Sequence, residues 1–134
     1  MADTSKAPHI DIMRSPLGRA RGLGSTHRGS AHWWLQRLTA TALVPLGLWF
    51  IFSVIGLAGA GRDQMTAWIG SPVSLSLMLA LIVATFYHMW LGLQVVVEDY
   101  VHVEGLKSII VSLIKGLCIM LALISIVSVL KIGL

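Results

Sequence analysis

Residues 64–97 read QMTAWIGSPVSLSLMLALIVATFYHMWLGLQVVV, a stretch without a single Asp, Glu, Lys or Arg. A membrane-spanning helix needs about 20 apolar residues, so this stretch is too long for one simple span. Ser71-Pro72 divides it, because serine is a favoured helix N-cap and proline is favoured at the first helical position. The sequence therefore predicts a span over about residues 72–98, preceded by a turn or short interfacial helix at 64–70.

Two further apolar stretches flank this span. Residues 38–61 carry no charged side chain and follow Trp33 and Trp34, which suit the aromatic belt at a membrane surface. The stretch from about 108 to 131 holds Lys115 as its only interior charge. We therefore expect an all-α membrane protein in which three transmembrane helices form half of a heteromeric helix bundle. The expected spans cover about residues 35–60, 72–98 and 108–131.

The composition of the 134-residue chain agrees with this expectation. Apolar residues make up 56% of it and charged residues 12%, whereas soluble domains have about 45–50% and about 25%. The length leaves no room for a separate soluble enzyme domain beside three spans. Cys118 is the single cysteine, which excludes an internal disulfide and any multi-cysteine metal or iron–sulfur site within this chain.

Residues 1–31 form a polar, basic arm before the expected three-helix membrane domain at 32–134. Asp3 and Asp11 are the only acids in residues 1–37. Six basic side chains oppose them: Lys6, Arg14, Arg19, Arg21, Arg28 and Arg37. Such a charge excess can indicate a nucleic-acid partner, but in so apolar a chain it indicates membrane topology instead. We expect no nucleic-acid partner.

The distribution of Lys and Arg predicts the orientation of the chain. With the N-terminus inside, the inner segments hold the six basic residues above and Lys107, whereas the outer segments hold Arg62 and Lys131. Seven against two favours an N-terminus in the cytoplasm, or in the matrix of a mitochondrion. The chain is thus expected to be a multi-pass protein of the bacterial inner membrane, or of the mitochondrial inner membrane in a eukaryote.

His88 is the most informative single residue. It precedes Asp99, at the inner end of its span, by eleven residues, which is about 16 Å of helix and about half of the hydrocarbon thickness. Ala84 and Gly92 lie one turn away on either side and would leave room for a flat porphyrin or for a close neighbouring helix. A haem would need a second axial ligand from another polypeptide, because no other span holds a histidine.

Other polar residues cluster near the inner membrane boundary. Arg37, with His32 five residues earlier, either binds an anion such as a propionate or follows the positive-inside rule. Tyr100 beside Asp99 is either an interface anchor or part of a site for a quinone headgroup, whose carbonyl a phenol can hydrogen-bond. Gln94 is expected to hydrogen-bond across helices.

The sequence resembles a known family at these positions. His88-Met-Trp-Leu-Gly92 followed by Glu98-Asp99-Tyr100 resembles the H-x3-G-x6-D-Y signature of the succinate dehydrogenase hydrophobic membrane anchor subunit. The segment at 32–40, HWWLQRLTA, resembles the start of the first helix in the alphaproteobacterial and mitochondrial-like form of this family. The resemblance covers about residues 29–131.

The resemblance implies a place in respiratory complex II. The partners would be a flavoprotein, an iron–sulfur subunit and a second, cytochrome b membrane anchor, with FAD and iron–sulfur clusters only in those partners. His88 would be one axial ligand of a haem b shared with the second anchor. Tyr100 and Asp99 would serve ubiquinone, and Arg37, less surely with His32, would meet the haem propionates. The chain alone would catalyse nothing.

Two alternatives remain open at this point. A fumarate reductase anchor would share these features and differ in the direction of catalysis. A haem-free structural or assembly subunit of another membrane complex would use His88 only to pack helices and would show no chromophore.

Overall fold

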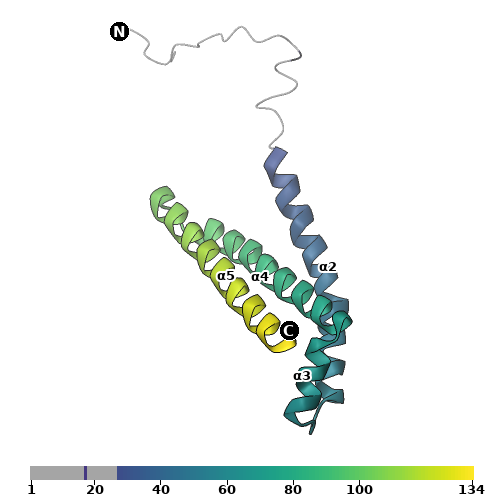
Figure 1. The fold of residues 1–134 in the computed structure, drawn as a ribbon. Helices are drawn as coiled ribbons and strands as arrows, with labels where there is room; N and C mark the ends of the chain where they lie inside the picture. The colour runs from purple at the N-terminus through teal and green to yellow at the C-terminus, as the bar shows by residue number, and fades with distance from the viewer. Residues whose placement is uncertain (1–16, 18–26) are drawn as a thin grey trace, which may run out of the picture.

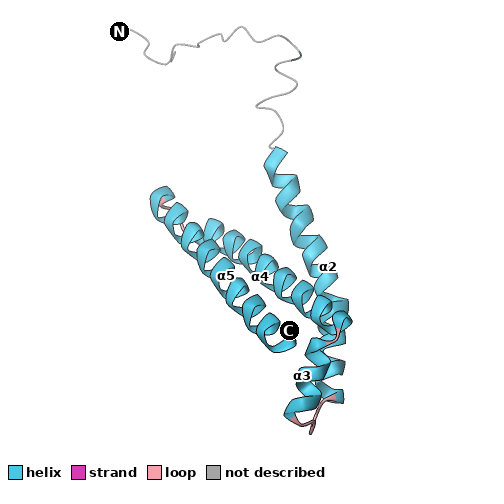
Figure 2. Ribbon diagram, in the orientation of Figure 1, coloured by secondary structure: helices cyan, strands magenta, loops and turns pink. Residues whose placement is uncertain are grey.

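The structure, a computed structural model, describes residue 17 and residues 27–134, so most of the expected arm at 1–31 lies outside the described residues. The part described contains the helices α2 (His27–Gly56), α3 (Arg62–Gly70), α4 (Pro72–Tyr100) and α5 (Glu104–Gly133) (Figure 1). Short loops join them, and these residues contain no strand (Figure 2). Helices α2, α4 and α5 are long and apolar enough to cross a membrane, which confirms the predicted all-α class and span number.

The helices and the expected spans differ at their ends. Helix α2 begins at His27, before the expected start at about 35, and ends at Gly56, before the expected end at about 60. Helices α4 and α5 each extend two or more residues past the predicted spans. Helical hydrogen bonds are satisfied in water as well as in lipid, so a helix need not stop where its apolar stretch stops.

The corner between α3 and α4 forms as the sequence predicts. Ser71 has an extended backbone with ψ of 136°, and its Oγ accepts a hydrogen bond from the backbone N–H of Ser74 at 3.3 Å. Its hydroxyl is also 3.0 Å from the carbonyl oxygen of Trp68, which closes the last turn of α3. Pro72 takes the first helical turn, where a missing N–H costs nothing.

Helix α4 is the centre of the fold. It packs against α2 on one side and against α5 on the other, whereas the α2 and α5 backbones do not come within 8 Å of each other. Helix α3 packs on α4 and α5, with Gly70 against the carbonyl of Gly133, and the rings of Trp49 and Trp68 stack at 5.7 Å. Helix α4 therefore lies between α2 and α5, and α3 adds contacts to its neighbours (Figure 1).

Very little of the described chain is buried. Leu91 is 2% exposed, Cys118 is 4% and Ser74 is 7%, while large apolar side chains such as Phe52, at 69%, lie exposed along the three long helices. Apolar surface on this scale is covered by lipid or by partner helices and not by water. The fold thus supports a membrane location, and its open helix faces leave space for neighbouring helices.

Candidate functional site

The mid-span histidine of α4 contacts a threonine of α2. His88 is part-buried, and its Nδ1 lies 3.0 Å from Oγ1 of Thr39, across 49 positions of sequence. Among the described residues, the second ring nitrogen of His88, Nε2, has no hydrogen-bond partner. The imidazole is thus hydrogen-bonded to α2 through Nδ1, and no described residue pairs with Nε2.

Thr39 is itself tied to its own helix. Its Oγ1 lies 2.8 Å from the carbonyl oxygen of Leu35 and 3.0 Å from that of Gln36. These are the i−4 and i−3 back-bonds that threonine makes inside helices. The hydroxyl that faces His88 therefore has a fixed position relative to the α2 backbone.

Gly92 lies one turn after His88 and faces the side chain of Gln36 on α2. A Cβ at Gly92 would sit 3.6 Å from Nε2 of Gln36. Gln36 precedes Thr39 by about one turn of α2, and Gly92 follows His88 by about one turn of α4. The two antiparallel helices therefore meet at both turns. The contact is with a side-chain amide at ordinary van der Waals distance, so both roles considered for this glycine stay predictions.

The expected pair of haem-propionate residues lies on different sides of α2. Five residues separate His32 from Arg37, which is about 140° of rotation around a helix. Arg37 is exposed, and its guanidinium lies 4.4 Å from the ring centroid of Trp33. His32 is half-buried, and its Nε2 is buried without a partner among the described residues. His32 shares its helix face with Thr39, seven residues or about two turns later.

The residues expected at a quinone site lie at the end of α4. Asp99 and Tyr100 are both exposed, the latter at 79%, so the described residues enclose neither side chain. Gln94, expected to bond across helices, makes its side-chain hydrogen bond along its own helix within the described residues. Its Nε2 donates to Oε1 of Glu98 at 2.8 Å, one turn along the same helix, because i,i+4 neighbours lie on one helix surface.

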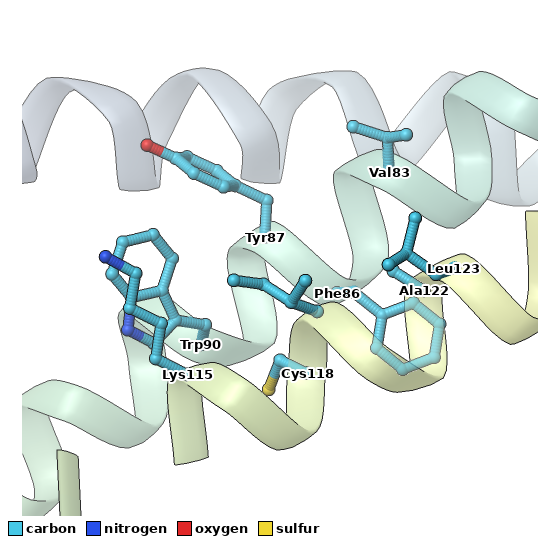
Figure 3. A pocket seen from close by; sticks show the side chains of 9 residues that line it. Val83, Phe86, Tyr87, Trp90, Lys115, Cys118, Ala122 and Leu123 are labelled. Carbon is cyan, nitrogen blue, oxygen red and sulfur yellow. The ribbon is translucent and has the colours of Figure 1, made fainter. Parts of the chain in front are cut away.

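A separate hollow of about 320 Å³ opens on the side of α4 that packs against α5 (Figure 3). Most of its lining is apolar and includes Phe86 and Cys118. The ammonium group of Lys115 lies 4.8 Å from the ring centroid of Trp90, so this charge rests on an aromatic face (Figure 3). The hollow lacks convergent polar side chains of the kind that bind or transform a polar substrate.

No group of three or more His, Cys, Asp or Glu side chains that could hold a metal ion occurs in the described part of the chain. A metal at His88 would need its other ligands from a macrocycle and from another polypeptide. Sequence reasoning missed Thr39, although it lies in the quoted segment at 32–40. The contact depends on the register of α2 against α4. That register cannot be predicted from the sequence of either helix alone.

These observations define a multi-pass helical membrane protein with one mid-span histidine and incomplete helix packing. The family model described as succinate dehydrogenase/fumarate reductase transmembrane subunit matches residues 11–130. The chain therefore belongs to this family of membrane subunits of oxidoreductase complexes, as the H…DY resemblance predicts.

Several similar proteins are succinate dehydrogenase anchors. The chain is 31% identical over 102 residues to the hydrophobic membrane anchor subunit of Rickettsia bellii, covering 76% of this chain and 82% of the relative. It is 29% identical over 109 residues to that of Paracoccus denitrificans, covering 81% and 84%. It is 31% identical over 98 residues to the membrane anchor subunit of Reclinomonas americana, covering 70% and 81%.

Proposed function

We propose that this chain is the membrane anchor of a succinate:ubiquinone oxidoreductase and that His88 is one axial ligand of a haem b. The observation that carries this proposal is the His88–Thr39 contact, which engages Nδ1 and leaves Nε2 without a partner among the described residues. Metal-binding histidines almost always have their second ring nitrogen hydrogen-bonded in this way. The residues therefore fit a haem, whose iron supplies one-electron redox chemistry when bound.

The proposal requires a second anchor. This chain offers one imidazole at mid-span, so the other axial ligand comes from a cytochrome b partner whose helices cover part of the exposed apolar surface. Arg37, with its exposed guanidinium, would meet a haem propionate, and His32 would be the weaker contributor. Because these two side chains lie on different sides of α2, they would reach the group from different directions.

Tyr100 and Asp99 would form this chain's part of the ubiquinone site. Their exposure at the end of α4 suits a site completed by the iron–sulfur subunit. The phenol of Tyr100 donates a hydrogen bond to a quinone carbonyl, and the carboxylate of Asp99 orders water that delivers protons. FAD and the iron–sulfur clusters belong to the flavoprotein and iron–sulfur partners, so succinate is oxidised outside this chain.

The same proposal gives an orientation. The basic arm at 1–31 and the loop after Tyr100 would lie on the inner face of the bacterial or mitochondrial inner membrane, with the anchor domain at 32–134 in the lipid. This arrangement places the proposed quinone residues on the side where a soluble iron–sulfur subunit would dock.

The haem assignment is tested by purifying the complex through a tag on this chain and recording its dithionite-reduced minus oxidised spectrum. We expect a b-type signal that is lost in His88→Ala while the partner subunits are still recovered. A wild-type complex without a b-type signal would contradict the assignment and favour a haem-free anchor.

The quinone assignment is tested with Tyr100→Phe, which removes one hydroxyl. Ubiquinone reduction should fall at least tenfold, while succinate oxidation by an artificial acceptor is unchanged. Tyr87→Phe, which removes a hydroxyl from a tyrosine of the α4–α5 hollow, is the matched control and should retain activity. Full ubiquinone reduction in Tyr100→Phe would remove this phenol from the site.

Fumarate reductase is a second candidate, because the matching family model covers both enzymes. The ratio of succinate oxidation to quinol-driven fumarate reduction in the purified complex distinguishes the two directions. A ratio that strongly favours fumarate reduction would select the second candidate without changing the roles proposed for His88 and Tyr100.

A further inference from the structure

We propose that Thr39 is a positioning residue for His88: its hydroxyl oxygen accepts a hydrogen bond from Nδ1–H and so presents Nε2 to the haem iron. This inference rests on the proposed function, since it assumes that His88 is an axial ligand. It concerns a residue on a different helix, and its own test is separate from that of ligation.

The hydrogen atoms at this contact decide the direction of the bond. A threonine hydroxyl has one proton and two lone pairs, and a neutral imidazole has one protonated nitrogen and one bare nitrogen. Oγ1 of Thr39 lies within hydrogen-bond distance of two backbone carbonyl oxygens, at 2.8 and 3.0 Å, and of Nδ1 at 3.0 Å. Carbonyl oxygens only accept, so the hydroxyl proton can be used within α2 and the oxygen then accepts from His88.

The opposite direction is incompatible with iron binding. If Thr39 donated to Nδ1, the neutral ring would carry its proton on Nε2, which would then have no lone pair for a metal. The observed back-bonds give the hydroxyl proton a backbone carbonyl as its acceptor. The ring can then carry its own proton on Nδ1 and keep the lone pair of Nε2 free for iron. The same bond fixes the rotation of the ring and makes the imidazole a stronger electron donor.

The position of Thr39 is set by neighbouring features that do not touch the imidazole. The back-bonds hold the hydroxyl against α2, and one turn away a Cβ at Gly92 would lie 3.6 Å from Nε2 of Gln36 on the same helix. The contact is part-buried in a segment expected to lie in lipid, where water does not compete for these groups. Substitution of Thr39 is therefore expected to alter the binding of the iron through the hydrogen bond at Nδ1, while His88 itself is unchanged.

The test uses the whole tagged complex with Thr39→Val, which keeps the shape and removes the hydroxyl, and Thr39→Ser, which keeps the hydroxyl. Thr41→Val is the matched control, because Thr41 makes the same type of back-bond, 2.9 Å to the carbonyl of Arg37, on an exposed side of α2. The measurements are haem content per assembled complex, the midpoint potential of the b-type signal and the electron paramagnetic resonance spectrum of the ferric haem.

We expect Thr39→Val to lower haem retention in detergent about tenfold or more and to shift the midpoint potential to a more positive value, because a less basic imidazole stabilises ferric iron less. Thr39→Ser should restore both quantities, and Thr41→Val should match wild type. Wild-type potential, haem content and resonance spectrum in Thr39→Val would overturn the positioning role.

The outcomes separate this inference from the proposed function. Haem retained in His88→Ala would overturn ligation by His88 itself. Haem lost in His88→Ala but unchanged in Thr39→Val would overturn only the role of Thr39. If Thr39→Val and Thr39→Ala both fail to assemble while Thr39→Ser assembles, the hydroxyl serves helix packing and the positioning role is likewise overturned.

Discussion

The two sides of α4 are built differently. Toward α2, the interface contains the His88–Thr39 hydrogen bond and Gly92, where an added Cβ would lie 3.6 Å from the side chain of Gln36. Toward α5, the described contacts are mostly apolar, with Cys118 buried and a hollow of about 320 Å³ that contains the Lys115–Trp90 contact. The α2 interface contains a hydrogen bond between side chains, and the described contacts of the α5 interface are mainly apolar.

The difference shows how a chemical site is fixed inside a membrane. Lipid tails are as apolar as leucine, so apolar side chains gain little by leaving lipid for a helix interface, and small residues and hydrogen bonds decide how closely helices approach. The α2 side uses both devices at the mid-span histidine. We therefore expect substitutions at the α2–α4 interface to affect the proposed haem binding and substitutions at the α4–α5 interface to affect stability.

Gly92→Leu should produce the largest effect, because it inserts a branched side chain where α2 approaches α4. We expect separation of Thr39 from His88 and loss of haem of about tenfold or more, measured as haem per assembled complex. Gly116→Leu is the matched control, since nothing lies within 4 Å of a Cβ placed at Gly116. Equal haem content in the two variants would mean that close approach of α2 is not required.

Leu91→Ala tests the apolar packing of α4 and should have the next largest effect. Leu91 is 2% exposed, so its truncation leaves a cavity and should lower the free energy of unfolding by about 2–4 kcal/mol. Leu93→Ala, at a position 40% exposed, is the control. Thermal unfolding of the complex in detergent measures both, and equal stability would show that Leu91 contributes no special packing.

Lys115→Met should have the smallest effect. It removes a cation from the Trp90 ring, a contact worth about 0.5–1 kcal/mol at an exposed site, and leaves the α2 side untouched. We expect a small loss of thermal stability and an unchanged haem spectrum, with Lys131→Met as the charge-matched control. A haem spectrum that shifts in Lys115→Met but not in Lys131→Met would contradict the expectation that only the α2–α4 interface affects the haem.

The sequence predicted the features that depend on local order. The apolar stretches identified three spans, Ser71-Pro72 identified the corner, and the spacing from Asp99 placed His88 near mid-span. The partner of His88 could not be predicted, because contact with Thr39 depends on the register between two helices separated by a loop and α3. The Gln94–Glu98 bond is different, because an i,i+4 pair on one helix can be predicted from the sequence alone.

The back-bonds of Thr39 also bear on the order in which the chain enters the bilayer. Helix α2 leaves the ribosome before α4, so it waits in lipid without the partner that later faces it. Its threonine can satisfy its hydroxyl proton on the carbonyls of Leu35 and Gln36 during that interval. The imidazole arrives second and finds an acceptor already in place, so α2 need not carry an unsatisfied hydroxyl donor into the membrane before α4 packs against it.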